Sequence, residues 1–156
     1  MRYEPVTDDV TLLIKQVIEG HFPELAGAKI LPIFDSKKKV SKGKFVIAQI
    51  KRINELEKYL TLDDVGDMDG YDYFLFINKV AWDIADEQDR VRIIRHEFRH
   101  TSVDNDSDKP YKLQPHDLED FFAEVRLNRE NPKWASELAA KALAAFGENS
   151  ETEEDE

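Results

Sequence analysis

The sequence predicts an α+β domain in which a small antiparallel or mixed sheet packs on a central helix, with further helices toward the C-terminus. Three observations support this fold class. Several segments repeat apolar residues at helical spacing. Other runs are rich in the aromatic and β-branched residues typical of strands. The composition, 41% hydrophobic with nine Phe, five Tyr and two Trp in 156 residues, is that of a globular chain with a real core.

A helix and three strands are expected in the first half of the chain. The helix begins after Thr7, an N-cap candidate followed by two aspartates, and ends near Gly20. Residues 28–34 and 45–51 have strand composition, and the lysine-rich turn between them predicts an antiparallel hairpin. Residues 71–78 form a third, strongly apolar and aromatic strand.

The C-terminal part is expected to hold two helices and an acidic tail. One helix begins near residues 115–117, where a proline suits the first helical turn, and the other runs from Pro132 to Gly147. Residues 148–156 are acidic and offer no apolar surface to bury. We therefore expect a single domain over residues 1–147 and a disordered tail over residues 148–156.

Composition narrows the function classes. A formal net charge of −11 argues against a protein that grips nucleic acid, so the lysine cluster at residues 37–44 is more simply a solvated turn than a phosphate contact. No apolar run is long enough to span a membrane and no secretory signal is evident, which predicts a cytoplasmic protein. The chain has no cysteine, so any transition metal must be held by histidines and carboxylates.

The pattern H-E-x-x-H occurs at residues 96–100 and is the strongest chemical signal in the sequence. Positions i and i+4 of a helix share one face, so His96 and His100 can hold one metal ion together. Glu97 lies about 100° round the helix, within reach of a water on that metal. The acidic residues 86–89 suit the first turn of this helix.

Hydrophobic spacing orients the same helix. Val91, Ile94 and Phe98 follow the i, i+3, i+7 pattern of a buried stripe. Ile94 lies about 200° from His96. The histidines are therefore expected to face away from the core, toward a cleft or solvent.

A catalytic zinc typically takes three protein ligands, so a third is expected downstream. His116 is the preferred candidate, because it is the only other histidine nearby and lies at a loop-to-helix junction. Glu119, three residues later on the same helix face, is the alternative as a ligand or as a partner that orients an imidazole. Glu124 and Asp104 are further candidates, although a solvated helix charge is the simpler interpretation of Glu124.

The order of these features resembles a known family. An apolar strand, a helix with H-E-x-x-H, a loop, the run His-Asp-Leu-Glu-Asp-Phe at residues 116–121 and the downstream Trp134 resemble the phage-type metallopeptidases. That family is similar to the SprT-like zinc peptidases, which are compact zincins. The resemblance implies a zincin-like domain, with a substrate-aligning strand at residues 71–77 bordering the cleft. It further implies Glu97 as general base and these zinc ligands: His96, His100 and His116.

The working hypothesis is a zinc-dependent metallopeptidase, a zinc metalloendopeptidase-like hydrolase acting on a protein or peptide. The alternative is a catalytically inactive zincin-like module of phage or prophage origin that binds metal or another protein, and a third is a structural domain with accidental histidines. Arg99 motivates the alternative, because a charged residue just before the second histidine is unusual. It could bind substrate or an oxyanion, or pair with Asp104 or Glu119. The missing cysteine zinc ribbon removes the DNA-linked role of SprT-like proteins.

Overall fold

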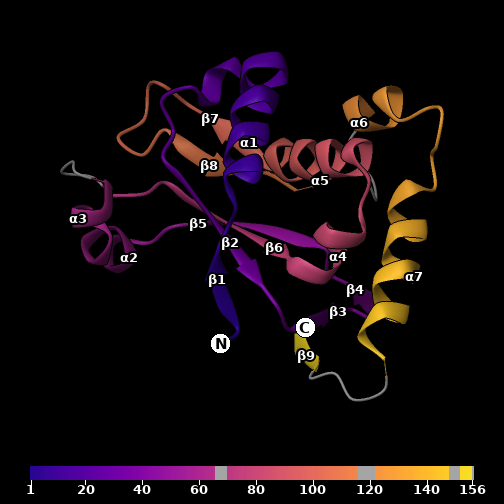
Figure 1. The fold of residues 1–156 in the computed structure, drawn as a ribbon. Coiled ribbons are helices and arrows are strands. Elements are labelled where there is room, and N and C mark those ends of the chain that lie inside the picture. The colour runs from indigo at the N-terminus through magenta and orange to yellow at the C-terminus, as the bar shows by residue number, and fades with distance from the viewer. Residues whose placement is uncertain (66–69, 116–121, 148–151, 156) are drawn as a thin grey trace.

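A four-stranded mixed sheet forms the centre of the molecule. The computed structural model describes residues 1–65, 70–115, 122–147 and 152–155 (Figure 1). The strand order is β1-β2-β6-β5, with β2 and β6 parallel and the other neighbours antiparallel. The predicted mixed sheet is thus confirmed. Its strands are β1 (Tyr3–Pro5), β2 (Ile30–Asp35), β5 (Ala48–Arg52) and β6 (Tyr73–Asn78).

The predicted hairpin between residues 28–34 and 45–51 is wrong, because β6 lies between β2 and β5. The lysine-rich segment instead makes its own small hairpin from β3 (Lys38–Ser41) and β4 (Lys44–Phe45). Its two-residue turn has positive φ at both Lys42 (51°) and Gly43 (76°), as a tight hairpin with a type I′ turn requires. The turn was therefore correctly located, but it joins different strands.

The core lies between the sheet and a layer of helices. Along β6, Tyr73, Leu75 and Ile77 alternate toward the helices and are fully buried, whereas Phe74 and Phe76 point to the opposite face and are half-buried. Figure 1 shows α1 (Asp8–His21) and α5 (Glu87–Arg99) side by side over the sheet. The helices contribute these residues to the core: Val10, Ile14, Val17, Ile93, Ile94, Phe98, Trp134 and Leu138.

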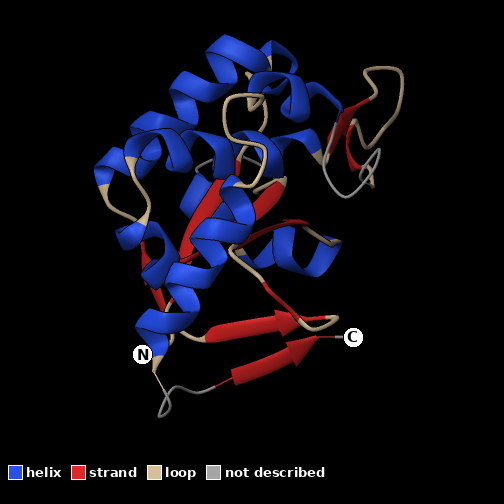
Figure 2. Cartoon of the chain, turned by 90° about the vertical axis from the view of Figure 1, so that its right-hand side faces the viewer, coloured by secondary structure: helices blue, strands red, loops and turns tan. Residues whose placement is uncertain are grey.

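Shorter elements connect this framework (Figure 2). A capping box at Asn54 starts α2 (Glu55–Leu60). A small hairpin, β7 with β8, follows α5 in a stretch expected to be a polar loop. None of the described helices is both long and apolar enough to cross a membrane. The remaining elements are η1 (Pro23–Leu25), α2 (Glu55–Leu60), α3 (Leu62–Val65), α4 (Lys79–Ile84), β7 (Thr101–Val103), β8 (Tyr111–Leu113), α6 (Phe122–Leu127) and α7 (Trp134–Phe146).

The acidic C-terminal stretch differs in part from the predicted disordered tail. Residues Thr152–Asp155 form β9, which pairs in parallel with β3. The lack of apolar surface does not prevent such pairing, because an extended segment can add to a strand edge by main-chain hydrogen bonds alone. Residues 148–151 and 156 lie outside the described part of the chain.

The N-cap of α5 gives a first testable prediction. The Asp86 carboxylate accepts a hydrogen bond from the backbone N–H of Asp89 at 2.7 Å. The Asp86→Ala variant should lose about 1 kcal/mol of the free energy of unfolding, the usual cost of an N-cap. Urea denaturation measures this loss. The control is Asp108→Ala, which changes an exposed aspartate in the β7–β8 loop; equal stability of the two variants would contradict the capping role.

Candidate metal centre

Helix α5 divides into three faces with different surroundings. Successive residues turn by about 100°, so Val91, Ile94 and Phe98 form the core face, as predicted, and Ile94 and Phe98 are fully buried. His96 and His100 lie on a second face, with Ile93 and Glu97. The third face carries three of the four arginines of the helix: Arg92, Arg95 and Arg99.

The two histidines line an open hollow of about 540 Å³. Their rings are 5.4 Å apart between centroids. One ligand atom from each of His96, Glu97 and His100 lies within 4.8 Å of the others. Imidazole nitrogen and carboxylate oxygen are both ligands that zinc accepts. This group is thus compact enough, and of the right chemistry, for one metal ion.

A hydrogen bond fixes the orientation and tautomer of His100. Its Nδ1 lies 2.9 Å from the carbonyl oxygen of Gln114. A carbonyl can only accept, so Nδ1 carries the proton and, in a neutral ring, Nε2 keeps its lone pair for a metal. Gln114 also returns two bonds to the end of α5: its backbone N–H donates to His100 and its side-chain amide donates to Arg99. Metal-binding histidines are commonly oriented in this way.

The buried carboxylate of Glu97 lacks a partner on one side. Glu97 is only 6% exposed, yet it lines the hollow, and its Oε2 accepts no hydrogen bond from the described residues. Burial raises the pKa of Glu97 to about 7, opposed by the nearby charge of His96. A buried oxygen without a hydrogen-bond partner, beside a hollow that two histidines line, is the arrangement expected where a metal and its water belong. The residues present therefore fit the metal.

The opposite wall of the hollow comes from β5, which corrects an expectation. Ala48, Gln49 and Ile50 line the hollow, whereas the strand at residues 71–77 corresponds to β6 and lies inside the sheet. Sequence analysis chose the more apolar strand, but a strand with neighbours on both sides is apolar because it is buried there. The strand bordering the cleft is therefore the edge strand β5.

The third-ligand candidates His116 and Glu119 lie outside the described residues, so they remain predictions. The described chain lines the hollow up to Pro115, the residue immediately before His116. Asp104 does not line the hollow; it pairs with Lys112 across the β7–β8 hairpin at 3.5 Å.

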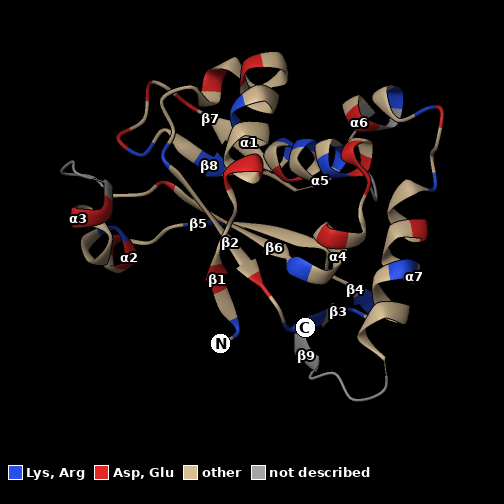
Figure 3. Ribbon diagram, in the orientation of Figure 1, with Lys and Arg blue, Asp and Glu red and all other residues tan. Residues whose placement is uncertain are grey.

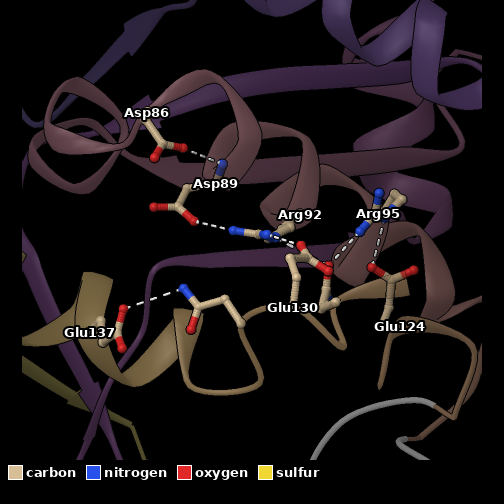
Figure 4. A network of polar contacts seen from close by, with 9 residues as sticks. Asp86, Asp89, Arg92, Arg95, Glu124, Glu130 and Glu137 are labelled. Atoms are coloured by element: carbon tan, nitrogen blue, oxygen red, sulfur yellow. Dashed lines mark hydrogen bonds and ion pairs between the residues drawn. The ribbon is translucent and has the colours of Figure 1, made fainter. Parts of the chain in front are cut away.

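Glu124 is not the solvated charge that the sequence suggested. It is fully buried (0% exposed) and binds two arginines of α5, with 2.9 Å to Arg95 Nε and 3.1 Å to Arg99 Nε. Figure 4 shows the contact of Glu124 with Arg95 within a larger polar network between α5 and the segment that follows α6, with Arg92 bound to Asp89 and Glu130. Glu124 therefore joins α6 to α5.

This contact also explains Arg99. Its guanidinium lies on the third face of α5, against Glu124 and over the ring of Phe22 at 4.6 Å from the centroid. Arg99 does not line the hollow. The expectation that it pairs with an acid is confirmed, but the acid is Glu124 and not Asp104; the other predicted partner, Glu119, lies outside the described residues.

Sequence reasoning missed Gln114 as the residue that orients His100, because nothing in the spacing joins them before the β7–β8 hairpin is known. A signal did exist. Thr-Ser-Val and Tyr-Lys-Leu, separated by a run of Asp, Asn and Ser, have hairpin composition. Tyr73 is buried and its hydroxyl donates to the backbone carbonyl of Lys112 at 2.7 Å, which holds this hairpin on the sheet.

Comparison with known proteins gives one match. Residues 1–143 match the family model described as "Putative phage metallopeptidase". Neither the curated proteins nor the solved structures compared with the chain gave a match. The matched region covers the four-stranded sheet, the β7–β8 hairpin, α5 and most of α7. Since the family model spans far more than half of the sequence, the chain belongs to this family of phage metallopeptidases.

Proposed function

We propose that the chain is a zinc-dependent metallopeptidase in which His96 and His100 bind the metal and Glu97 acts as the general base. One observation carries the proposal: Glu97 is a buried carboxylate with an unpartnered oxygen, between two histidines that share a hollow. His116 is proposed as the third ligand, with Glu119 as its alternative. The similarity to SprT-like zincins, which rests on the sequence motifs, is part of this proposal.

Zinc, when bound, would polarise the scissile carbonyl and lower the pKa of a coordinated water toward about 7. The residues of the chain supply the remaining steps. Glu97 takes a proton from the attacking water and delivers it to the amine nitrogen as the carbon–nitrogen bond breaks. Its raised pKa, about 7, suits both transfers near neutral pH. Gln114 holds His100 with Nε2 toward the hollow.

The edge of β5 is proposed to align the substrate. The backbone N–H of Ile53 donates to Asp72, just before β6, and the carbonyl of Ile47 accepts from Asn78 of β6. Hydrogen-bonded pairs alternate along an antiparallel ladder. The backbone groups of Ala48, Ile50 and Arg52 therefore point outward, and the described residues give them no hydrogen-bond partner. An extended peptide can add to such an edge by main-chain hydrogen bonds. This geometry supports the proposal that the substrate is a peptide or protein.

The metal itself provides the first test. The purified chain should bind one equivalent of zinc, and dialysis against a chelator should abolish cleavage of an unstructured protein such as casein until zinc is restored. His96→Ala and His100→Ala should each lose the metal, because two ligands cannot replace three. His21→Ala is the matched control, since His21 is exposed and does not line the hollow. Metal content by elemental analysis and peptide release are measured together.

The outcomes separate the alternatives. A chain without stoichiometric metal would have accidental histidines. One equivalent of metal without cleavage of a broad peptide library would favour the inactive binding module. Arg99 was one of two reasons for that alternative, the other being that no specificity pocket is visible in the sequence. The pairing of Arg99 with Glu124 away from the hollow removes the first reason.

A further inference from the structure

The lysine-rich hairpin lies beside the metal centre and is not used by the proposed mechanism. Five lysines occur within residues 37–44, on a chain whose net charge is −11. Figure 3 shows these basic residues gathered at β3 and β4. Ser41, the last residue of β3, and Val46, just after β4, both line the hollow with His96. The hairpin is therefore continuous with one wall of the candidate site.

An acidic strand is already seated on this hairpin. The sheet order is β4-β3-β9, so β9 occupies the edge of β3 that β4 leaves available. The register pairs Lys38 with Thr152, Lys39 with Glu153, Val40 with Glu154 and Ser41 with Asp155. An extended segment with three acidic residues out of four thus runs in parallel along β3 and reaches the residue that lines the hollow (Figure 2).

We propose that β3 is a binding edge for acidic, extended polypeptide segments, and that β9 is its displaceable intramolecular occupant. Main-chain pairing with β3 would provide the alignment, and the lysines of the hairpin would select acidic sequences. A segment bound in the place of β9 would be led to Ser41 and so to the mouth of the hollow. Where cleavage is concerned, this inference rests on the proposed function; the binding itself does not.

The position of α7 explains why the tail occupies this edge. Phe146, at the end of α7, packs on Phe45 of β4 with ring centroids 5.7 Å apart. Residues 147–151 then connect the helix to β9. A short connection of this kind gives an effective concentration on the order of millimolar. An acidic segment from another chain must compete with it, and exposed charge pairs are weakened by salt. Exchange at β3 is therefore expected to be readily reversible.

The test measures binding to the full-length chain with the tail weakened as a competitor. The triple variant Glu153→Gln, Glu154→Gln, Asp155→Asn keeps the full length of the chain but removes the acidic charge of β9. The probe is a fluorescent peptide with the sequence ENSETEEDE, compared with a neutral peptide in which Gln and Asn replace its acids. Fluorescence anisotropy should show the acidic peptide bound at least about tenfold more tightly by this variant than by the unchanged chain.

The lysines supply matched controls. In the tail variant, the added pair Lys38→Gln and Lys42→Gln should abolish the gain for the acidic peptide. The pair Lys15→Gln and Lys141→Gln, which removes two exposed lysines from α1 and α7, should leave it intact. Unchanged far-UV circular dichroism establishes that each variant is folded.

Three results would overturn the proposal. These are equal binding of the neutral and acidic peptides, equal effects of the two lysine pairs, or tighter binding of a single-stranded DNA of the same charge. The last result would assign the lysines to a nucleic acid. All measurements can be made without zinc, so failure of the peptidase mechanism would leave the binding result unchanged. Absence of peptide binding at β3 would likewise leave the roles proposed for His96, Glu97 and His100 untouched, because zinc content and cleavage are measured separately.

Discussion

The Glu97→Gln variant is expected to bind zinc as the unchanged chain does and to cleave peptide bonds about 100- to 10,000-fold more slowly, the usual contribution of a general base. Glutamine keeps the size of Glu97 and is neutral, so it fills the same buried position beside His96 without accepting a proton from water. Initial rates of peptide release at equal zinc content measure the effect.

A second glutamate in α5 provides the control. Glu87→Gln makes the same chemical change in the first turn of the helix, at an exposed position. It should leave the rate within about a factor of two, because a surface change far from the reacting atoms adds no barrier. Turnover by Glu97→Gln equal to that of Glu87→Gln would exclude Glu97 as the base. Loss of zinc from Glu97→Gln alone would instead make Glu97 a ligand.

The Glu124→Ala variant is expected to lose about 3–5 kcal/mol of the free energy of unfolding, the range for removing one partner of a buried ion pair. Glu124 is fully buried, and each of its oxygens accepts a hydrogen bond from an arginine of α5. Without it, Arg95 and Arg99 keep their charges in a site where their side chains are only 11% and 22% exposed. Urea denaturation measures the loss.

A variant of the neighbouring acid Glu130 distinguishes the effect of losing a buried charge on stability from the effect of losing an exposed one. It also binds an arginine of α5, Arg92, but its own side chain is about half exposed. Water can replace much of that contact, so Glu130→Ala should destabilise the chain far less than Glu124→Ala. If both variants unfold at the same urea concentration, the contact between α5 and α6 does not depend on the buried carboxylate.

Local sequence patterns predicted the elements and failed where distant segments meet. The spacing of Val91, Ile94 and Phe98 correctly gave the core face of α5, because side-chain direction along a helix depends only on local geometry. The insertion of β6 between β2 and β5 depends on pairing between segments far apart in sequence. Composition contains no direct signal for such a register. The acidic segment of β9 was likewise judged without its lysine-rich partner.

In the candidate site, too, local spacing was predictable from the sequence and contacts between distant segments were not. His96, Glu97 and His100 could be brought together from one helical turn alone. The burial of Glu124 could not be predicted in this way, because an acid on a predicted helix is usually solvated. The spacing of the arginines at positions 92, 95 and 99 was the available signal, since it places three cations on one helical face that must find acids if it is covered.

The hydrogen bonds between His100 and Gln114 have a consequence for protein engineering. Backbone and side-chain bonds join these two residues at the base of the β7–β8 hairpin, so the geometry at the histidine does not depend on the length of the loop beyond it. Residues 104–106, at the tip, are exposed and polar. Longer loops cost little additional closure entropy. The tip is therefore a suitable insertion point for an epitope or a targeting peptide in a chain that retains the geometry of the candidate metal centre.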